Sequence, residues 1–335
     1  MKATLSYILK PGPHRPFLTL LLCVVLLTIL DGGQGRFLNL NTLRSALQTF
    51  ATLAPIALGL GAAMLIREFD LSIAGLFGLA GCVAVLTGMD APILSVLAAV
   101  LVGTVVGLIQ GVVIVRLRLG SVGVTLGGLL ICAGLALVIS GNRIIGYDNM
   151  DVAILMGERM FGVFTLRSLI ALGCVVLFAG AFHFLRYGRD AIAIGSNRQA
   201  AAATGVHVAA ITIGIFALSG MMTALSGSLL SYSLASASPT GLSDVLVPAT
   251  AAAILGGVSL GGGAGGPLGV AAGVMVLSVL RAGVNAIGAP PFVNDLTIGG
   301  VLLVVAIIDG PELARRLAEL RKPFARPSSE PSIGS

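Results

Sequence analysis

The chain has 335 residues, of which 56% are hydrophobic and only 10% are charged, whereas ordinary soluble domains carry about 25% charged residues. So few charged side chains exclude a fold whose whole surface faces water. The net charge of +6 would suit a nucleic-acid partner, but the basic residues lie in short loops and at the two ends without interleaved aromatic residues, a pattern that indicates a lipid bilayer and no nucleic acid.

Ten apolar segments follow one another along the chain, and most are long enough to cross a hydrocarbon core as helices. A lipid-facing β-barrel would instead show short segments of alternating polar and apolar residues. We therefore predict an all-α polytopic membrane protein with about ten transmembrane helices, of which the eighth and tenth are short. The predicted spans are residues 17–30, 45–66, 71–89, 91–115, 122–140, 167–187, 208–232, 245–260, 267–287 and 296–308.

The first predicted span follows Lys2, Lys10 and Arg15, an arrangement that also occurs in signal peptides. Residues 31–35 offer no convincing cleavage site of the small-x-small kind, so we expect an uncleaved first helix. The alternative is cleavage near Gly35, which would remove one span.

The charged residues predict how the chain is oriented, because loops on the cytoplasmic side retain an excess of Lys and Arg. Ten spans place both termini and most basic loops in the cytoplasm. We expect a cytoplasmic segment at 1–16, a transmembrane domain at 17–310 and a basic, partly disordered cytoplasmic tail at 311–335. The predicted cytoplasmic side holds Arg67, Arg116, Arg118, Arg186, Arg189 and Arg198, and the opposite side holds Asp31, Asp90, Asp148, Asp151, Glu158, Asp244 and Asp295, with Arg36, Arg44, Arg143 and Arg159.

No set of residues for catalysis, metal binding or nucleotide binding is visible. The three histidines are scattered, and the four cysteines lie inside apolar segments without the spacing of metal ligands. No glycine-rich loop ends in Gly-Lys-Ser/Thr. We therefore expect a chain that is not an enzyme, holds no metal and has no cofactor of its own.

A short helix is predicted in the segment after the sixth span. Ser196 or Asn197 suits the N-cap and Gly205 suits the residue that ends the helix, so about two turns of small residues would lie parallel to the membrane on the cytoplasmic face. An alanine-rich helix without a large apolar face can fit into a groove of another protein.

The same segment resembles the cytoplasmic coupling loop of the ribose-type sugar ABC importer permeases. Further resemblances to that family occur in the same order along the chain, and together they cover residues 45–310. The matching residues are Asp70-Leu71-Ser72, Thr125-Leu126-Gly127, Gly195, Asn197, Ala200, Ala201 and Gly205, and a structural glycine motif of Gly256, Gly257, Ser259, Gly261 and Gly262.

The resemblance implies the permease subunit of a binding-protein-dependent, ATP-driven importer in the bacterial cell inner membrane. Its solute would be a small polar molecule, a monosaccharide such as a ribose-like pentose, a hexose or a polyol. The implied partners are an extracytoplasmic solute-binding protein, a second permease copy or paralogue, and a cytoplasmic ATP-binding subunit that binds ATP and Mg. That subunit would dock on Arg189, Gly195, Ser196, Asn197, Ala200, Ala201 and Gly205.

The chain departs from the family pattern at three places. Arg67-Glu68 stand where the family usually has two glycines, Gly120-Ser121 stand where it has Pro-Phe, and Leu246 stands where it often has Glu. These departures leave nucleosides and branched-chain amino acids open as solutes.

Polar residues inside predicted spans are candidates for the translocation pathway, because an ionisable residue costs about 2.5–3.5 kcal/mol at mid-membrane and usually faces the bundle interior. Arg281 would donate hydrogen bonds to the solute, or would instead pair with Asp295 or reach the outer interface. A hypothesis from another class is a stand-alone secondary transporter or facilitator, which would use buried Asp, Glu or His for ion coupling. The candidates are Asp70, Gln110, Thr125, Arg281 and Asn285.

Overall fold

The structure is a computed structural model that describes residues 15–240, 243–290 and 292–303. These residues are almost entirely helical, and the only strands among them are a two-residue antiparallel pair, β1 (Ile145–Gly146) with β2 (Ser236–Ala237). Six of the helices are long and apolar enough to cross a membrane. The predicted all-α, polytopic membrane class is therefore confirmed for the described residues.

Every predicted span overlaps one apolar helix. The end of the last predicted span, residues 304–308, and most of both predicted terminal segments lie outside the described residues. The six long helices are α3 (Leu40–Leu65), α5 (Pro92–Leu117), α6 (Ser121–Ser140), α8 (Leu166–Phe184), α11 (Val208–Ser233) and α13 (Pro267–Ala286). The shorter ones are α2 (Arg15–Leu30), α4 (Ile73–Thr87), α12 (Leu246–Leu255) and a helix at Phe292–Leu303.

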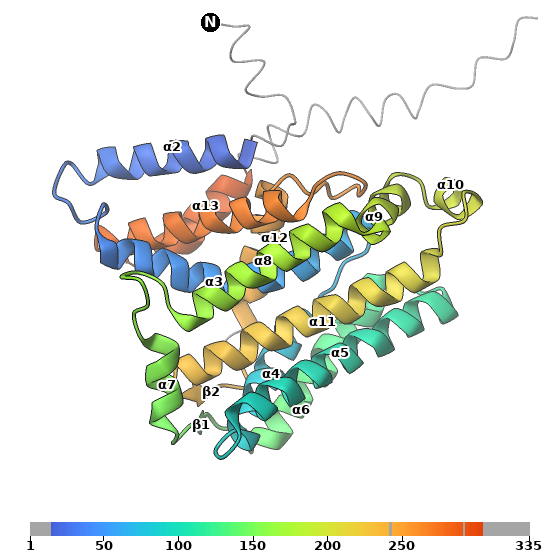
Figure 1. The fold of residues 1–335 in the computed structure, drawn as a ribbon, viewed down its shortest axis with the longest axis horizontal. Helices are drawn as coiled ribbons and strands as arrows, with labels where there is room; N and C mark the ends of the chain where they lie inside the picture. The colour runs from blue at the N-terminus through green and yellow to red at the C-terminus, as the bar shows by residue number, and fades with distance from the viewer. Residues whose placement is uncertain (1–14, 241–242, 291, 304–335) are drawn as a thin grey trace, which may run out of the picture.

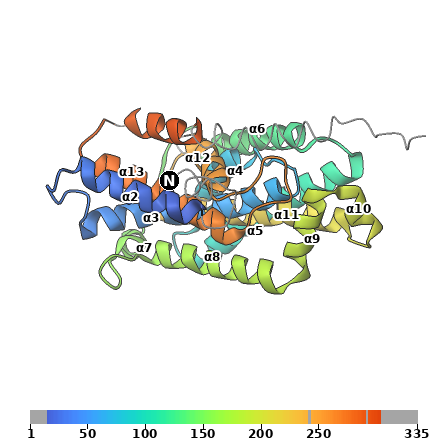
Figure 2. The same cartoon turned by 90° about the horizontal axis from the view of Figure 1, so that it is seen from above.

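The long helices run side by side, with α11 between α3 on one side and α4 and α5 on the other (Figure 1). Seen from above, α7 and α8 lie along one face of the molecule, and α6 and the helix Phe292–Leu303 lie along the opposite face (Figure 2). A Cβ at Gly103 or Gly107 of α5 would overlap backbone carbonyl oxygens of α11. Small residues thus let the two helices pack backbone against backbone, as is common where lipid surrounds a bundle.

The two ends of the bundle differ in their connecting segments. Two short helices, α9 (Arg186–Ser196) and α10 (Arg198–Ala203), lie at one end, which we name the α10 end. The short helix α7 (Met150–Gly157) lies with β1 and β2 at the opposite end, the α7 end (Figure 1). Arg67, Arg118 and Arg198 gather at the α10 end.

The first helix, α2, packs on the rest of the bundle. Cys23 and Leu27 of α2 are buried in the main hydrophobic core, and Gly283 of α13 lies against Leu27 and Phe37. Residues of α2 thus contribute to the core of the bundle, and retention of this helix without cleavage stays a prediction.

Several predicted boundaries are wrong. The second span was predicted to begin at residue 45 and the tenth at residue 296, but the helices begin at Leu40, capped by Asn39, and at Phe292. The eighth span was predicted to run to residue 260, but α12 ends at Leu255, because Gly257 and Gly262 adopt left-handed conformations that a helix cannot contain. The sixth span was predicted to reach residue 187, but the chain is extended at Leu185, with ψ 153°, and a separate amphipathic helix, α9, follows.

Candidate functional site

The predicted short helix of the coupling-loop segment is present as α10. Asn197 is its N-cap, since the side-chain oxygen accepts hydrogen bonds from the N–H groups of Gln199 (3.1 Å) and Ala200 (3.0 Å). Gly205 ends the helix with a φ of +88°, and the next N–H, of Val206, donates to Ala201 O (3.1 Å). Both ends of this short helix are therefore closed by the residues that the sequence predicted.

The residues predicted to dock the ATP-binding subunit divide into two groups. Gly195 and Ala201 are buried and face the bundle. A Cβ at Gly195 would overlap Leu65 O and Gly263 N, so only glycine allows this close approach. The remaining members are exposed and form the outward surface of the loop, namely Arg189, Ser196, Asn197, Ala200 and Gly205.

Two residues just after α3 hold this loop against the bundle. Arg67 donates from Nε to Gly195 O (2.6 Å) and from Nη2 to Ser196 O (3.0 Å). Glu68 forms an ion pair with Arg198, with 2.6 Å between Oε1 and Nη1. The departure from the family pattern at these positions thus supplies side chains that bind the predicted docking loop.

The start of α9 is tied to α11 by a tyrosine. Tyr187 donates its hydroxyl hydrogen to Ile211 O (3.2 Å). Burial raises the pKa of Tyr187 to about 12, so the hydroxyl stays a donor at neutral pH.

The predicted glycine motif forms a tight loop beside the docking segment. The loop is closed by Ser259, whose N–H donates to Ala264 O (3.1 Å) and whose hydroxyl accepts from Gly261 N (3.2 Å). Gly263 N then donates to Leu65 O (2.9 Å), which joins the loop to the end of α3. Gly256, at the beginning of the motif, packs backbone to backbone against α13.

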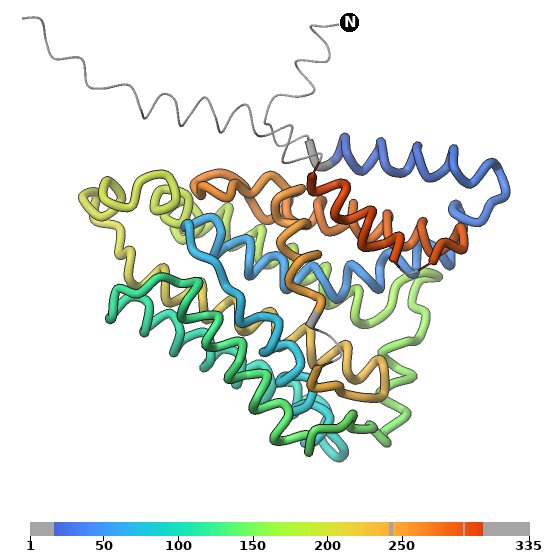
Figure 3. Tube along the Cα trace, turned by 180° about the vertical axis from the view of Figure 1, so that it is seen from behind, coloured from blue at the N-terminus to red at the C-terminus, as the bar shows by residue number. Residues whose placement is uncertain are grey.

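The segment between α3 and α4, residues 66–72, is not helical and enters the bundle (Figure 3). Its Asp70 is only 1% exposed. One carboxylate oxygen accepts from Ser72 N (3.0 Å) and Ser72 Oγ (2.6 Å), and the other accepts from Ser219 Oγ (2.7 Å) of α11. The carboxylate lies at the start of α4, where the dipole of a helix favours negative charge.

Two further predicted pathway residues lie around the same segment. The Thr125 hydroxyl has two acceptors within hydrogen-bonding distance, Ser121 O (2.8 Å) and Phe69 O (3.2 Å). Gln110 is 5% exposed and lies over Gly128, and neither of its polar atoms has a hydrogen-bond partner among the described residues. An unbonded buried amide costs free energy, so Gln110 is ready to bind a water molecule or a solute hydroxyl.

A second stretch outside the α-helices packs on α4 inside the bundle. Residues 238–240 and the short 3-10 helix η1 (Ser243–Val245) precede α12. η1 packs on α4, and Gly78 of α4 lies against Pro239 O. Unwound backbone within a membrane protein is tolerated where it is buried or lines a hydrated cavity, and interrupted helices often border transport sites. Hydropathy alone did not predict this feature, because both interrupted stretches adjoin apolar segments.

The other two predicted pathway residues lie apart from this interior, on α13. Arg281 is partly buried, and no ion pair joins it to Asp295. Asn285 is exposed and accepts a hydrogen bond from Asn294 (2.9 Å). The predicted pathway set is therefore split between two places.

Sequence reasoning missed Arg167, which is 4% exposed near the α7 end. It donates to Gln48 Oε1 (3.1 Å) and Thr52 Oγ1 (2.6 Å) of α3 and to Ser233 Oγ (3.0 Å) of α11. No carboxylate pairs with it among the described residues. The signal that could have found it is the polar pair at positions 48 and 52, one turn apart in an apolar span.

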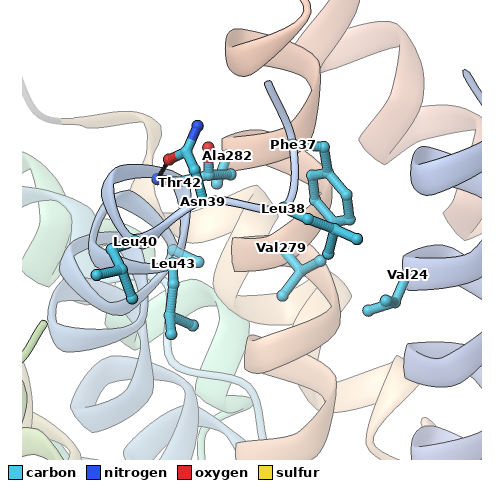
Figure 4. A pocket seen from close by; sticks show the side chains of 10 residues that line it. Val24, Phe37, Leu38, Asn39, Leu40, Thr42, Leu43, Val279 and Ala282 are labelled. Carbon is cyan, nitrogen blue, oxygen red and sulfur yellow. Dashed lines mark hydrogen bonds between the residues drawn. The ribbon is translucent and has the colours of Figure 1, made fainter. Parts of the chain in front are cut away.

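A cavity of about 410 Å³ lies between α2, α3 and α13 at the α7 end (Figure 4). Its polar side chains are Asn39, whose Oδ1 accepts from Thr42 N (2.8 Å), and Thr42, whose hydroxyl donates to Arg36 O (3.0 Å). The remaining lining is apolar: Val24, Phe37, Leu38, Leu40, Leu43, Ala46, Val279 and Ala282. Such a wall suits an acyl chain better than a polar solute. Among the described residues, no group of three His, Cys, Asp or Glu could hold a metal ion.

Comparison with known proteins gives the family. Residues 42–306 match the family described as "Branched-chain amino acid transport system / permease component". The chain is 30% identical to the ribose import permease protein RbsC of Escherichia coli K12 over 298 residues, covering 87% of this chain and 92% of RbsC. It is 30% identical to the L-arabinose ABC transporter permease protein AraH of Azospirillum brasilense over 295 residues, 85% of each chain.

A third relative is the autoinducer 2 import system permease protein LsrC of Escherichia coli SMS-3-5, which is 32% identical over 303 residues, 88% of this chain and 86% of LsrC. No solved structure matches the chain. The family match spans most of the chain, and the relatives align over nearly their whole length. The chain therefore belongs to this family of multi-pass membrane permeases, the transmembrane components of ABC transport systems.

Proposed function

We propose that the chain is the permease subunit of a binding-protein-dependent, ATP-driven importer in a bacterial inner membrane, and that its solute is a monosaccharide. The observation that supports the importer is α10, a capped and exposed short helix whose junction with α9 is held to the bundle by side chains from the turn after α3. The sugar class rests on RbsC and AraH, whose names give ribose and arabinose. LsrC, an autoinducer 2 permease, keeps other small polar solutes within the family's range.

The proposed orientation places the α10 end in the cytoplasm. Arg67, Arg118 and Arg198 lie at this end, and the acidic residues of α7 and its flanks lie at the other. This distribution follows the positive-inside rule. With ten spans, both termini would then lie in the cytoplasm.

In this proposal the partners perform the steps that the chain itself does not. A cytoplasmic ATP-binding subunit docks on the exposed face of α10, binds ATP with Mg and hydrolyses it, and a solute-binding protein delivers the sugar at the α7 end. A second permease copy or paralogue completes the pore. Solute would cross by alternating access, in which closure of the ATP-binding subunits rearranges the helices.

The interior around residues 66–72 is the proposed contact region for the solute. Ser72, Gln110 and Thr125 offer hydroxyl and amide groups beside unwound backbone, which suits the hydroxyls of a sugar. The unbonded amide of Gln110 is the clearest place for such a hydrogen bond.

A stand-alone, ion-coupled transporter is the second candidate, and Asp70 is the observation that favours it. Transporters of that class use buried carboxylates to take up ions, and Asp70 is nearly inaccessible inside the bundle. Its hydrogen bonds to Ser72 and Ser219 also account for it as a structural cap of α4, which makes the importer the better-supported function.

The test is reconstitution of the full-length chain in liposomes, alone and with an ATP-binding subunit and a solute-binding protein from the same organism. Uptake of radiolabelled D-ribose, L-arabinose and uridine is measured with and without ATP. The importer requires all three components and ATP. Uptake by the chain alone, driven by an ion gradient, would overturn it in favour of the second candidate.

A matched pair of variants tests the docking face. Ala200→Trp places a large side chain on the exposed face of α10, and Ile154→Trp places one on exposed α7 at the other end. We expect Ala200→Trp to abolish co-purification of the ATP-binding subunit and Ile154→Trp to preserve it. Equal co-purification of both variants would contradict docking at α10.

A further inference from the structure

The turn that follows α3 has an unusual backbone conformation at Arg67. Its φ is +64°, in the left-handed region that residues with a side chain rarely adopt. Such a conformation persists where surrounding contacts determine it. At Arg67 those contacts are made by the guanidinium group, so the strained turn aims a long side chain at the docking loop.

Arg67 binds the end of α9. Gly195 O and Ser196 O belong to the last residues of α9, where carbonyl groups lack partners within the helix and the helix dipole is negative. The guanidinium donates to both oxygens, at 2.6 and 3.0 Å. Arg67 thereby acts as a cationic cap for the helix that leads into α10.

Glu68 binds the beginning of α10. Its partner Arg198 is the first residue of α10, and the second terminal nitrogen of Arg198 donates to Thr212 Oγ1 of α11 (3.2 Å). The side chain of Glu68 is 11% exposed and that of Arg198 is 46% exposed, so the pair lies at the boundary between bundle and solvent. Two consecutive residues therefore hold both sides of the junction between α9 and α10.

The next residues of the same segment are fixed deep in the bundle. Phe69 N donates to Ser121 Oγ of α6 (3.1 Å), and Asp70 accepts from Ser219 Oγ of α11 (2.7 Å). Within four residues, 67–70, the chain thus connects the exposed loop to the interior from which α4 begins.

The junction has space in which to move. A cavity of about 560 Å³ adjoins Glu68 and Arg198 and is walled by residues at the end of α5 and the start of α11. A displacement of α10 toward this cavity would carry Arg198, the partner of Glu68, with it.

We propose that Arg67 and Glu68 are positioning residues that transmit movement of α10 to residues 69–72 and α4. This inference rests on the proposed function, because it assumes that an ATP-binding subunit moves α10. Neither residue is proposed to touch the solute. Arg67 fixes the end of α9, Glu68 fixes the start of α10, and the backbone between them and Asp70 passes the displacement inward.

The test uses the complete transporter in liposomes, with radiolabelled D-ribose as the probe, and measures ribose taken up per ATP hydrolysed. Arg67→Gly removes the guanidinium but suits the positive φ, so it separates the hydrogen bonds from the backbone strain. Glu68→Gln keeps the shape of Glu68 and removes its charge. We expect both variants to retain the ATP-binding subunit and to lose at least about fivefold in ribose per ATP, the lower range of measured couplings between sites.

Rescue distinguishes transmission from simple damage. The double variant Glu68→Arg with Arg198→Glu restores an ion pair of reversed polarity, and we expect it to recover most of the ratio that either single change removes. Arg118→Gln, which removes a neighbouring charge from the same cavity wall, is the control and should leave the ratio unchanged.

The outcomes separate the two proposals. A wild-type chain that neither retains an ATP-binding subunit nor requires ATP would overturn the proposed function. A wild-type complex that couples normally, together with Arg67→Gly and Glu68→Gln variants of unchanged ratio, would overturn the inference alone. If Glu68→Arg and Arg198→Glu each lower the ratio of ribose to ATP and the double variant does not recover it, the role of Glu68 would be overturned.

Discussion

The two ends of the bundle hold their helices together with arginines in very different surroundings. At the α7 end, Arg167 is buried and binds only neutral oxygen atoms, from α3 and α11. At the α10 end, Arg67 and Arg198 are partly or largely exposed and bind backbone carbonyls and a carboxylate.

The difference determines which contacts can be broken during a transport cycle. Arg167 cannot leave its partners without leaving polar groups of three helices unbonded in an apolar core, which is costly. The contacts at the α10 end can exchange with water at little cost. The ends of α3, α8 and α11 near α7 should therefore move as one block, while the α10 end adjusts.

Aromatic packing strengthens the α7 end further. Tyr147 and Tyr232 are buried and stack with ring centroids 4.6 Å apart, and Tyr147 donates to Gly88 O (2.9 Å) while Tyr232 donates to Ala84 O (3.0 Å). These bonds join the β1–β2 region to α4. Within the described residues, the α10 end has no comparable aromatic stack on its docking loop.

The largest expected loss of stability comes from Arg167→Met. The change leaves the oxygen atoms of Gln48, Thr52 and Ser233 without their donor, but it also removes the cost of burying a charge. On balance we expect the free energy of unfolding to fall by about 3 kcal/mol. Titration of mixed micelles with sodium dodecyl sulfate measures it. Arg159→Met, at an exposed arginine of the same end, is the control and should cost under about 1 kcal/mol. Equal losses would remove the distinction between the two ends.

A smaller loss of stability and a complete loss of coupling are expected from Gly195→Ala. The added Cβ would overlap backbone atoms of Leu65 and Gly263, which cannot rotate away. We expect about 2 kcal/mol of destabilisation and displacement of α10, read out as lost stimulation of ATP hydrolysis by the solute-binding protein. Gly180→Ala on α8 meets open space and should lower neither quantity. Normal stimulation in Gly195→Ala would show that this close approach is dispensable.

Local patterns in the sequence predicted the features of each helix but not the contacts between helices. The spans follow from apolar length, and α10 follows from a capping Asn197 and a terminating Gly205, because each depends on residues a few positions apart. Arg67 binds residues 128 and 129 positions away. Such a pairing depends on how the whole bundle packs, so the departure at Arg67 and Glu68 was visible while its role was not.

The interrupted helices were missed for a related reason. Asp70 and its neighbours precede an apolar stretch that hydropathy interprets as part of a full span, although the helix begins only at Ile73. Composition cannot distinguish a helix that crosses the membrane from a shorter helix whose unwound end is buried against α11. Among the predicted pathway residues, Asp70, Gln110 and Thr125 are buried, and Arg281 lies apart from them on α13, which the sequence did not indicate. Their part in translocation stays a prediction.

Between the two ends, Asp70→Asn tests how firmly the interior is fixed. The amide keeps the size of the carboxylate but loses its charge. Its NH₂ group can face the Ser219 hydroxyl, which donates to Asp70 in the wild-type chain. We expect a loss of about 1.5 kcal/mol in the same unfolding titration, since hydrogen bonds to a charged group are worth about 1.5–3 kcal/mol. Asp90→Asn, at a loop carboxylate, is the control. A stabilised Asp70→Asn variant would indicate that the carboxyl group is uncharged here, which would favour the ion-coupled alternative.

The smallest change in stability is expected from Glu68→Gln. Because the Arg198 side chain is 46% exposed, solvent screens the pair, and exposed ion pairs contribute about 0–1 kcal/mol. The free energy of unfolding of this variant should therefore match that of the wild-type chain. At about 1 M salt the Debye length falls to about 3 Å. The wild-type transporter should then take up less ribose per ATP hydrolysed, with a ratio close to that of the variant. A contact that affects transport strongly and stability weakly is what an adjustable end requires. A loss of stability as large as that of Arg167→Met would place Glu68 among the fixed contacts instead, and the contrast between the two ends would no longer hold.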